Sequence, residues 1–238
     1  MAKFTGKKAL VTGATKGIGL ALSLSLLEEG ATTFLVGRNF DLLDSKLRDL
    51  SLTDHSFHKI NADLTNDEDI SHIIHLIGDH TIDFLIHSAG VISLGKLEKL
   101  PVKDLDLQYT INVRAPFMLT QKLLPSLKKS GGQILFINST AGLCSWDSVS
   151  QYSASKHALK AMANSLRQEV SGEGIRVMNL FIGSVDTPMQ QDIQQQLGHM
   201  DYHPEKYMKA EDIAGLIADL LAQPDGLAIT DITVKPNT

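Results

Sequence analysis

The sequence contains little of what secreted, membrane-spanning or nucleic-acid-binding proteins need. Its single cysteine, Cys144, cannot form an internal disulfide, which fits a reducing compartment such as the cytoplasm. There is no apolar run of about 18 residues and no basic, apolar and small pattern at the start, so we expect neither a membrane span nor an export signal. The net charge of −5 argues against nucleic-acid binding, because proteins that bind nucleic acid usually present a basic face.

We do not expect a metal site or a cysteine nucleophile either. Nine histidines are present, and His72, His75 and His80 stand close together in the sequence. The cysteine is distant from them, and their segment is typical of the exposed side of a surface helix rather than of a zinc site. Cys144 has no evident partnering base in the sequence.

The length and composition predict one domain. The chain has 238 residues, of which 43% are hydrophobic, and α/β folds of this size commonly bury a single core. Strand-like apolar runs alternate with helical patterns, and the runs are typical of strands buried on both faces of a parallel sheet. We predict a single α/β domain, residues 1–238, with a doubly wound parallel sheet and helices on both faces.

The predicted strands are residues 8–12, 33–36, 82–86, 134–137 and 177–182, and the predicted helices are residues 20–29, 41–50, 67–77, 102–124, 149–170 and 210–221. Ligands bind at the carboxyl ends of the strands in such sheets. Five residues with potential binding roles follow these predicted strands, namely Gly13, Gly37, Ala89, Ser139 and Gly183, and a sixth, Asp63, is expected at the end of a further strand.

A glycine-rich turn follows the first predicted strand. It reads Gly13-Ala14-Thr15-Lys16-Gly17-Ile18-Gly19 and leads into an apolar helix. Strand, glycine turn and helix start is the context in which such a motif binds a dinucleotide. Glycines let the backbone approach a pyrophosphate closely, and the helix N-terminus supplies free N–H donors. The turn therefore predicts a dinucleotide site.

Tyr152 and Lys156 stand four residues apart in the sequence, after Ser139. In a helix such a pair lies on one face, so the ammonium would sit over the phenol. A cation beside a phenol favours the phenolate and should lower the pKa from its ordinary value of about 10 toward the working range. The Ser139 hydroxyl could then hold a carbonyl oxygen. A Tyr and a Lys at this spacing are common on solvated helix faces, so the pair alone does not indicate a catalytic site. The other motifs of the chain support the catalytic interpretation.

Together these motifs resemble the short-chain dehydrogenase/reductase family over nearly the whole chain. Thr12-Gly13-Ala14-Thr15-Lys16-Gly17-Ile18-Gly19 is similar to the family's cofactor loop, and His87-Ser88-Ala89-Gly90 to its Asn-Asn-Ala-Gly turn. Asn61-Ala62-Asp63-Leu64-Thr65 resembles the strand end where the family places an Asp by the adenine. Asn112, Ser139, Tyr152 and Lys156 match the family's catalytic set in order. The resemblance implies a Rossmann fold, with a cofactor-binding half in residues 1–95 and a catalytic and substrate-binding half in residues 96–238.

The resemblance also implies roles for individual residues. Tyr152 would give a proton to a substrate carbonyl held by Ser139 and Tyr152, Lys156 would tune Tyr152 and bind the ribose, and Asn112 would hold a water that returns a proton toward Lys156. The residues expected to contact the cofactor are Gly13, Thr15, Lys16, Gly17, Ile18, Gly19, Arg38, Asp63, Leu64, Ser88, Ala89, Gly90, Asn112, Tyr152, Lys156, Gly183, Val185 and Thr187.

The end of the second strand indicates which cofactor binds. NAD sites place an acidic residue about 20 residues beyond the glycine loop, and here that place is Val36-Gly37-Arg38-Asn39, with no carboxylate. The planar guanidinium of Arg38 suits a phosphate, and Lys16 would add a second positive charge. We therefore predict NADP(H) over NAD(H).

Three departures from the family pattern concern details of the site and the assembly. His87-Ser88 replaces the two asparagines, Ile182 stands where proline is usual, and the chain lacks the usual Asp-Gly-Gly ending. In the family that ending often lies at a subunit contact. We expect a homo-oligomer, a dimer or a tetramer, and its size stays open.

Three functions remain open. The first is NADPH-dependent reduction of a small ketone, diketone or aldehyde, the second is reduction of a 3-oxoacyl group on an acyl carrier protein, and the third is a cofactor-binding sensor or scaffold without turnover. The substrate wall is expected in residues 90–99, 141–150 and 188–207, where Leu143, Cys144, Trp146 and Met189 either present apolar surface or pack the loops. The polar stretch within residues 188–207 is a hypothetical lid.

Overall fold

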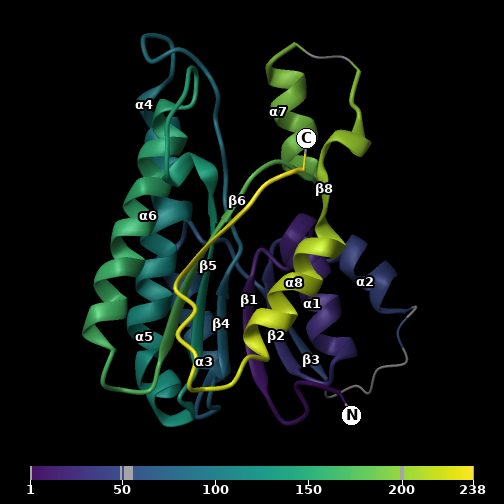
Figure 1. Ribbon diagram of the computed structural model, residues 1–238, viewed down its shortest axis with the longest axis vertical. Helices are drawn as coiled ribbons and strands as arrows, with labels where there is room; N and C mark the ends of the chain where they lie inside the picture. Colours follow the sequence, from purple (N-terminus) through teal and green to yellow (C-terminus); the bar gives the residue numbers. More distant parts are fainter. Residues whose placement is uncertain (1, 49, 51–55, 199–200, 238) are drawn as a thin grey trace.

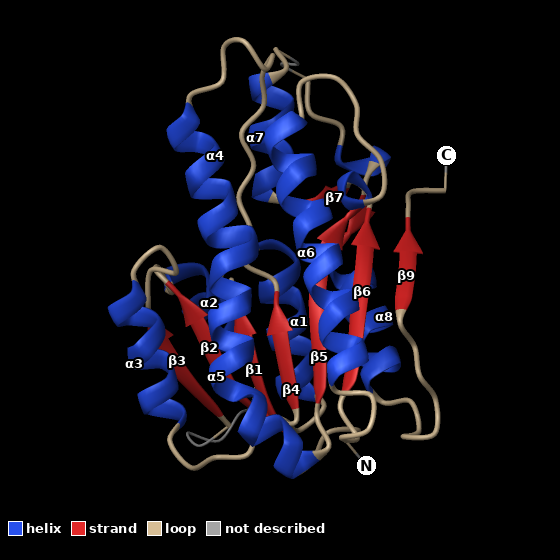
Figure 2. Ribbon diagram, turned by 90° about the vertical axis from the view of Figure 1, so that its left-hand side faces the viewer, coloured by secondary structure: helices blue, strands red, loops and turns tan. Residues whose placement is uncertain are grey.

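The computed structural model of the protein describes residues 2–48, 50, 56–198 and 201–237. Its centre is a seven-stranded sheet with the strand order β3-β2-β1-β4-β5-β6-β9, in which every pairing is parallel (Figure 2). The predicted doubly wound parallel sheet is confirmed. The strands are β1 (Lys8–Thr12), β2 (Thr32–Gly37), β3 (Phe57–Asn61), β4 (Phe84–His87), β5 (Gln133–Ser139), β6 (Arg176–Ile182) and β9 (Asp231–Val234).

Helices cover both faces of this sheet (Figure 1). The α-helices of the described part of the chain are α1 (Gly17–Glu28), α2 (Asp41–Leu47), α3 (Asp67–Ile77), α4 (Val102–Tyr109), α5 (Ala115–Ser130), α6 (Ser150–Glu169), α7 (Pro188–Gln196) and α8 (Ala210–Leu221). A second, two-stranded parallel sheet pairs β7 (Val185–Asp186) with β8 (Met208–Lys209). Its two strands precede α7 and α8, respectively.

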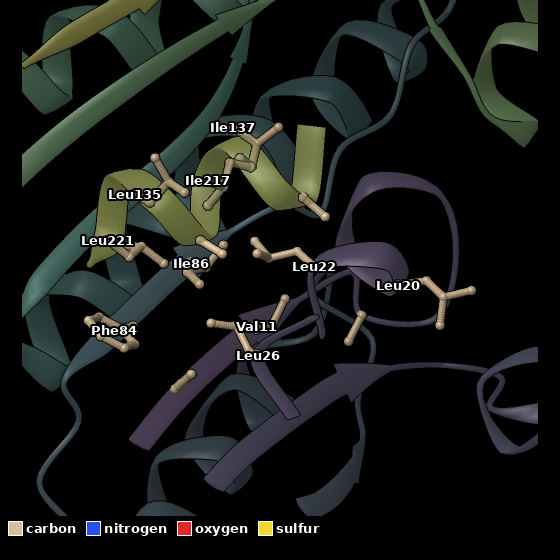
Figure 3. Close-up of a cluster of buried hydrophobic side chains, with 14 of the residues drawn as sticks. Val11, Leu20, Leu22, Leu26, Phe84, Ile86, Leu135, Ile137, Ile217 and Leu221 are labelled. Carbon is tan, nitrogen blue, oxygen red and sulfur yellow. The ribbon is translucent and has the colours of Figure 1, made fainter. Parts of the chain in front are cut away.

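The side chains of the strands divide the core into two layers. On one face, Val11, Ile86 and Leu135 pack against apolar residues of α1, α2 and α8, as Figure 3 shows for Leu22 and Ile217. On the other face, a separate cluster of buried residues joins the strands to α3, α5 and α6. The central strands β1, β4 and β5 bury both faces, which is why they are almost continuous apolar runs in the sequence.

Local signals set the two ends of α3 where the sequence predicted them. The Asn66 side chain caps α3 by accepting a hydrogen bond from the Glu68 N–H at 2.8 Å, and Gly78 ends the helix with a positive φ of 52°. The predicted bounds of the helices at residues 67–77 and 210–221 are confirmed. Of the helix predicted at residues 41–50, the structure has Asp41–Leu47, and residue 49 lies outside the described part.

The segment predicted as one helix, residues 102–124, differs in the structure. It begins at Val102 as expected, but a π-helical turn, Thr110–Arg114, interrupts it before α5 continues to Ser130. A π turn inserts one residue into the helical repeat and often occurs at a functional site. It carries Asn112, which is 1% exposed.

The strand order reverses between β1 and β4. The chain runs outward from β1 to β2 and β3, returns to β4, and then continues outward to β5, β6 and β9. Loops that leave the two strands at such a point diverge, which creates a crevice at the carboxyl ends of the strands. In Figure 2, α4 and α7 stand at the end of the sheet to which the strand arrows point.

Candidate active site

A cleft of about 530 Å³ opens at the carboxyl ends of the strands. Of the catalytic and cofactor-contact residues that the sequence predicted, all except Asn112 line this cleft: Gly13, Thr15, Lys16, Gly17, Ile18, Gly19, Arg38, Asp63, Leu64, Ser88, Ala89, Gly90, Ser139, Tyr152, Lys156, Gly183, Val185 and Thr187. Most of them follow strand ends far apart in the sequence, and Tyr152 and Lys156 lie on α6, so the parallel topology brings them together. Of the four side chains considered for the substrate wall, Trp146 and Met189 line the cleft, and Leu143 and Cys144 do not.

The glycine turn is packed so tightly that side chains cannot replace two of its glycines. A Cβ on Gly13 would lie 2.8 Å from the Ala89 backbone, and Gly13 has a φ of +67°. A Cβ on Gly19 would lie 2.2 Å from the Gly13 carbonyl oxygen. The turn therefore holds its backbone against the loop after β4, and it leaves the floor of the cleft free of side chains for a ligand.

The N-terminus of α1 faces this turn and is not capped. Lys16 occupies the N-cap position without a side-chain hydrogen bond to the helix, and the first turn holds no acidic residue. The N–H groups of a helix N-terminus together with the helix dipole bind phosphate groups. The glycine cradle and this helix end thus fit the pyrophosphate of a dinucleotide.

Charged side chains lie on the surface at the end of the cleft near β2 and β3. The Arg38 guanidinium is 3.7 Å from the Asp63 carboxylate, and the Arg38 side chain is 68% exposed. Hydrogen bonds from the Thr65 N–H and hydroxyl, at 2.9 and 2.8 Å, lower the pKa of Asp63, and Arg38 contributes a smaller effect. An exposed pair at this distance is weak, so Arg38 can turn toward an anion.

At the other end, Tyr152 and Lys156 lie on one face of α6 beside Ser139 at the end of β5. The Lys156 Nζ lies 5.7 Å from the centroid of the Tyr152 ring and donates a hydrogen bond to the Ile137 carbonyl oxygen at 3.1 Å. Lys156 is 4% exposed. The predicted side-by-side arrangement of ammonium and phenol is therefore present.

The expected lowering of the Tyr152 pKa is absent. Burial raises the pKa of Tyr152 to about 12, and a hydrogen bond with Ser139 offsets only part of this rise. Burial also lowers the pKa of Lys156 to about 8. Removal of both groups from water outweighs the influence of the ammonium on the phenol, because desolvation disfavours either charged form. A pKa of about 12 keeps the Tyr152 phenol neutral at ordinary pH.

Asn112 lies behind the cleft rather than in its wall. Its side-chain oxygen accepts a hydrogen bond from the Val91 N–H, and its amide nitrogen donates to the Val91 carbonyl and the Ser155 hydroxyl, at 2.9, 2.9 and 3.0 Å. The amide has used both of its N–H donors. Asn112 thus joins the loop after β4 to α6 through its bond to Ser155. The Ser155 hydroxyl donates in turn to the Tyr152 carbonyl at 2.8 Å.

The sequence prediction missed several residues that hold the site in shape. The Thr12 hydroxyl accepts hydrogen bonds from the N–H groups of Ser88 and Ala89 at 3.2 Å. Gln108, which is fully buried, donates to the Gln151 side chain at 3.0 Å, beside Tyr152. Thr12 stands next to the glycine motif and could have been found from it, whereas Gln108 carries no local signal.

His87, at the end of β4, is fully enclosed beneath the cleft. Its Nε2 is 2.9 Å from the Thr120 hydroxyl, and its ring stacks on Phe136 with 4.9 Å between centroids. Its Nδ1 is buried and has no hydrogen-bond partner among the residues that the structure describes. Burial lowers the pKa of His87 to about 3, so the ring is neutral at ordinary pH.

The outer wall of the cleft joins three segments that the sequence pointed to. The Gly95 N–H donates to the Ser148 carbonyl at 2.9 Å, and the Lys96 ammonium pairs with both oxygens of Asp147 at 2.6 and 2.7 Å. The Leu94 N–H approaches the Gln196 side-chain oxygen of α7 at 3.4 Å. Residues 199–200 of the stretch proposed as a lid lie outside the described part.

Within the described ranges, no group of three or more histidine, cysteine, aspartate or glutamate side chains is placed to hold a metal ion. Likewise, none of the helices in the described part of the chain has the length and apolar character needed to cross a membrane.

Comparisons with known proteins identify related sequences. A family model described as "short chain dehydrogenase" matches residues 7–198. An uncharacterized oxidoreductase of Staphylococcus epidermidis is 31% identical, and the match covers 99% of this chain and 100% of that protein. An uncharacterized oxidoreductase of Staphylococcus aureus is 32% identical with the same coverage.

Solved structures share the fold. A Serratia marcescens short-chain dehydrogenase/reductase double mutant superposes with a TM-score of 0.86 at 27% identity, covering 98% of each chain. An actinorhodin polyketide ketoreductase with NADPH superposes with a TM-score of 0.87 at 24% identity, covering 99% of this chain and 98% of that one. An alcohol dehydrogenase from Thermococcus sibiricus complexed with 5-hydroxy-NADP has a TM-score of 0.84 at 22% identity, covering 96% of this chain and 95% of that one.

Proposed function

The chain belongs to the short-chain dehydrogenase family of oxidoreductases, and from this premise we propose that it uses NADPH to reduce the carbonyl group of a small ketone, diketone or aldehyde to an alcohol. The observation that carries the proposal is the joint position of Ser139, Tyr152 and Lys156 on the wall of one cleft, opposite a glycine cradle with an uncapped helix N-terminus. A bound nicotinamide cofactor would supply the hydride.

The residues of the chain would supply orientation and a proton. The hydroxyls of Ser139 and Tyr152 point to the same carbonyl oxygen in our proposal, and they stabilise the negative charge that develops on it. Tyr152 gives its proton to that oxygen, which requires the neutral phenol, and a pKa of about 12 supports this state. The Lys156 ammonium stabilises the phenolate that remains, although its own proton is held less firmly because of burial.

Asn112 is proposed to support this chemistry by position. The family resemblance implies that Asn112 holds a water that returns a proton toward Lys156. Both N–H donors of its side chain are committed to Val91 and Ser155, and its Oδ1 retains one lone pair after accepting from Val91. A Cβ on Gly90 would lie 3.4 Å from that oxygen and 3.8 Å from Lys156 Nζ, so the three groups are neighbours. A water held here would use this lone pair.

We propose NADPH rather than NADH because of the charges near the end of β2. Arg38 is exposed and only loosely paired, and Lys16 stands at the start of α1. A ribose phosphate would gain a bidentate contact from the guanidinium and a second positive charge from the ammonium. In the same proposal, residues 1–95 supply most of the cofactor contacts, and residues 96–238 supply the catalytic groups and the substrate wall.

Absorbance of NADPH with a panel of ketones, diketones and acetoacetyl thioesters tests the proposal against its alternatives. Turnover of simple ketones that Tyr152→Phe abolishes would support it. Turnover of the thioesters alone would favour 3-oxoacyl-carrier reduction, and NADPH binding without any turnover would favour a sensor or scaffold. The homo-oligomeric state and the cytoplasmic location remain predictions, and light scattering of the purified protein tests the first.

A further inference from the structure

The cleft has two chemically different ends. Among the described residues that line it, the charged side chains are Lys16, Arg38, Asp63, Asp147 and Lys156. Lys16, Arg38 and Asp63 belong to the end that the proposed function assigns to the nucleotide. At the end beyond Tyr152, apolar side chains from three segments predominate: Val91, Ile92, Leu94, Trp146, Val149, Met189, Ile193 and Leu197.

Neither charge at this apolar end is available to bind an anion. Lys156 is 4% exposed and donates to the Ile137 carbonyl oxygen. Asp147 is itself an anion, and both of its oxygens accept hydrogen bonds from the Lys96 ammonium. Lys96 does not line the cleft. A carboxylate or phosphate entering here would lose water without gaining a free cation among the described residues, which is costly.

The apolar wall is preorganised and partly uncovered. The hydrogen bonds of Gly95 with Ser148 and of Leu94 with Gln196 fix its three segments to one another. Trp146 is nonetheless 53% exposed and Leu197 is 48% exposed. Apolar surface that lines a concave site and remains open to water gains free energy when an apolar ligand covers it.

We therefore infer that the substrate is an uncharged carbonyl compound with an apolar body, and that compounds carrying a carboxylate or phosphate next to the carbonyl are rejected. This inference rests on the proposed function, because that function places the reacting carbonyl at Ser139 and Tyr152. It narrows the substrate class from carbonyl compounds in general to those whose remaining part contacts Trp146 and the side chains of α7.

A matched pair of probes tests the inference, namely ethyl benzoylformate and benzoylformate, which present the same ketone and ring and differ in the negative charge. In NADPH-dependent turnover we expect kcat/KM to be at least about 100-fold higher for the ester, the order of the cost of an uncompensated charge. In protein saturated with NADP+, where no reduction can occur, calorimetry should show binding of the ester and much weaker binding of the acid.

The two readouts separate this inference from the proposed function. Ester binding without turnover would leave the inference standing and contradict hydride transfer. Equal or tighter binding of benzoylformate, or no detectable binding of either probe, would overturn the inference whatever the turnover.

A positive charge placed in the apolar wall of the cleft should change the preference for the ester over the acid. Ile193→Arg introduces a cation at a half-buried position of α7 that lines the cleft. We expect it to reduce the preference for the ester by about tenfold or more, because the guanidinium can pair with the carboxylate. Leu227→Arg is the matched control, since Leu227 is exposed and lies outside the cleft. An unchanged preference in a folded Ile193→Arg protein would count against the inference.

Discussion

The two ends of the cleft hold their charges in opposite ways. At the catalytic end, Lys156 is 4% exposed and its ammonium bonds to a backbone carbonyl. At the nucleotide end, Arg38 is 68% exposed and lies 3.7 Å from Asp63. Burial therefore controls the pKa values of Tyr152 and Lys156, whereas Arg38 is a largely exposed charge that can rearrange around a ligand.

This contrast suggests a division of tasks. Groups that exchange a proton need a fixed geometry and a shifted pKa. The bonds that Asn112 and Ser155 make fix the geometry, and burial shifts the pKa values. A group that only binds a phosphate needs a charge and a side chain long enough to contact it. Mutations at the buried end should therefore change the rate of reduction, and mutations at the exposed end should change the choice of cofactor.

The largest effect is expected at Tyr152. Tyr152→Phe removes the proton donor while keeping the ring, so kcat/KM for the ketone should fall about 1000-fold, within the range for general acid catalysis. The dissociation constant of NADPH, measured by fluorescence titration, should change little. Equal loss of turnover and of NADPH binding would place Tyr152 in cofactor binding instead.

A smaller effect is expected at the exposed end. Arg38→Asp places a carboxylate where NAD-dependent proteins have one, so it should repel the ribose phosphate and accept a bond from a ribose hydroxyl. We expect the ratio of kcat/KM for NADPH to that for NADH to fall about 100-fold, on the order of two charge-assisted hydrogen bonds. Arg48→Asp, near the end of α2 and outside the cleft, serves as the control. A ratio that Arg38→Asp leaves unchanged would remove Arg38 from cofactor selection.

The pH dependence of the rate of reduction should further distinguish the buried end of the cleft from the exposed end. Burial lowers the pKa of Lys156 to about 8, so its ammonium is present below that pH and lost above it. The rate of reduction should fall by up to about tenfold per pH unit above about pH 8. Tyr152 does not cause this fall, since its pKa is about 12. The profile of kcat/KM against pH checks the prediction, and a flat profile to pH values of about 10 would contradict it.

The smallest effect concerns stability rather than rate. The native His87 resists protonation until about pH 3, while the unfolded histidine takes up a proton near pH 6.5. The unfolded state therefore binds more protons between these values, and the free energy of unfolding should fall as the pH falls, by up to about 1.4 kcal/mol per unit.

Denaturant titrations at several pH values measure this slope. His87→Asn should reduce it, whereas His72→Asn, at an exposed position, should not. An identical slope in wild type and His87→Asn would show that His87 does not control acid stability.

The sequence predicted the centre of the sheet better than its edges. The continuous apolar runs of β1, β4 and β5 reflect burial on both faces. The edge strand β9 has no fully buried residue, and β3 buries only Ile60, so neither carries an apolar run. The strand before Asp63 was expected only from the family resemblance, and β9 was not predicted.

The sequence likewise predicted some features of the site and not others. The order of strand ends in a parallel sheet was sufficient to gather the cleft residues, because that order depends only on topology. The π turn at Asn112 and the buried Gln108–Gln151 pair depend on packing between α4, the π turn and α6. The direction of the Tyr152 pKa shift was wrong for the same reason, since burial is a tertiary property.

Transfer of deuterium to a ketone from NADPH labelled at both C4 positions of its nicotinamide ring tests the central claim most directly. With the wild-type protein we predict an alcohol that carries deuterium on the former carbonyl carbon, as mass spectrometry would show, and with Tyr152→Phe we predict about 1000-fold slower formation of that product. An alcohol without deuterium, or equal product from both proteins, would contradict the account.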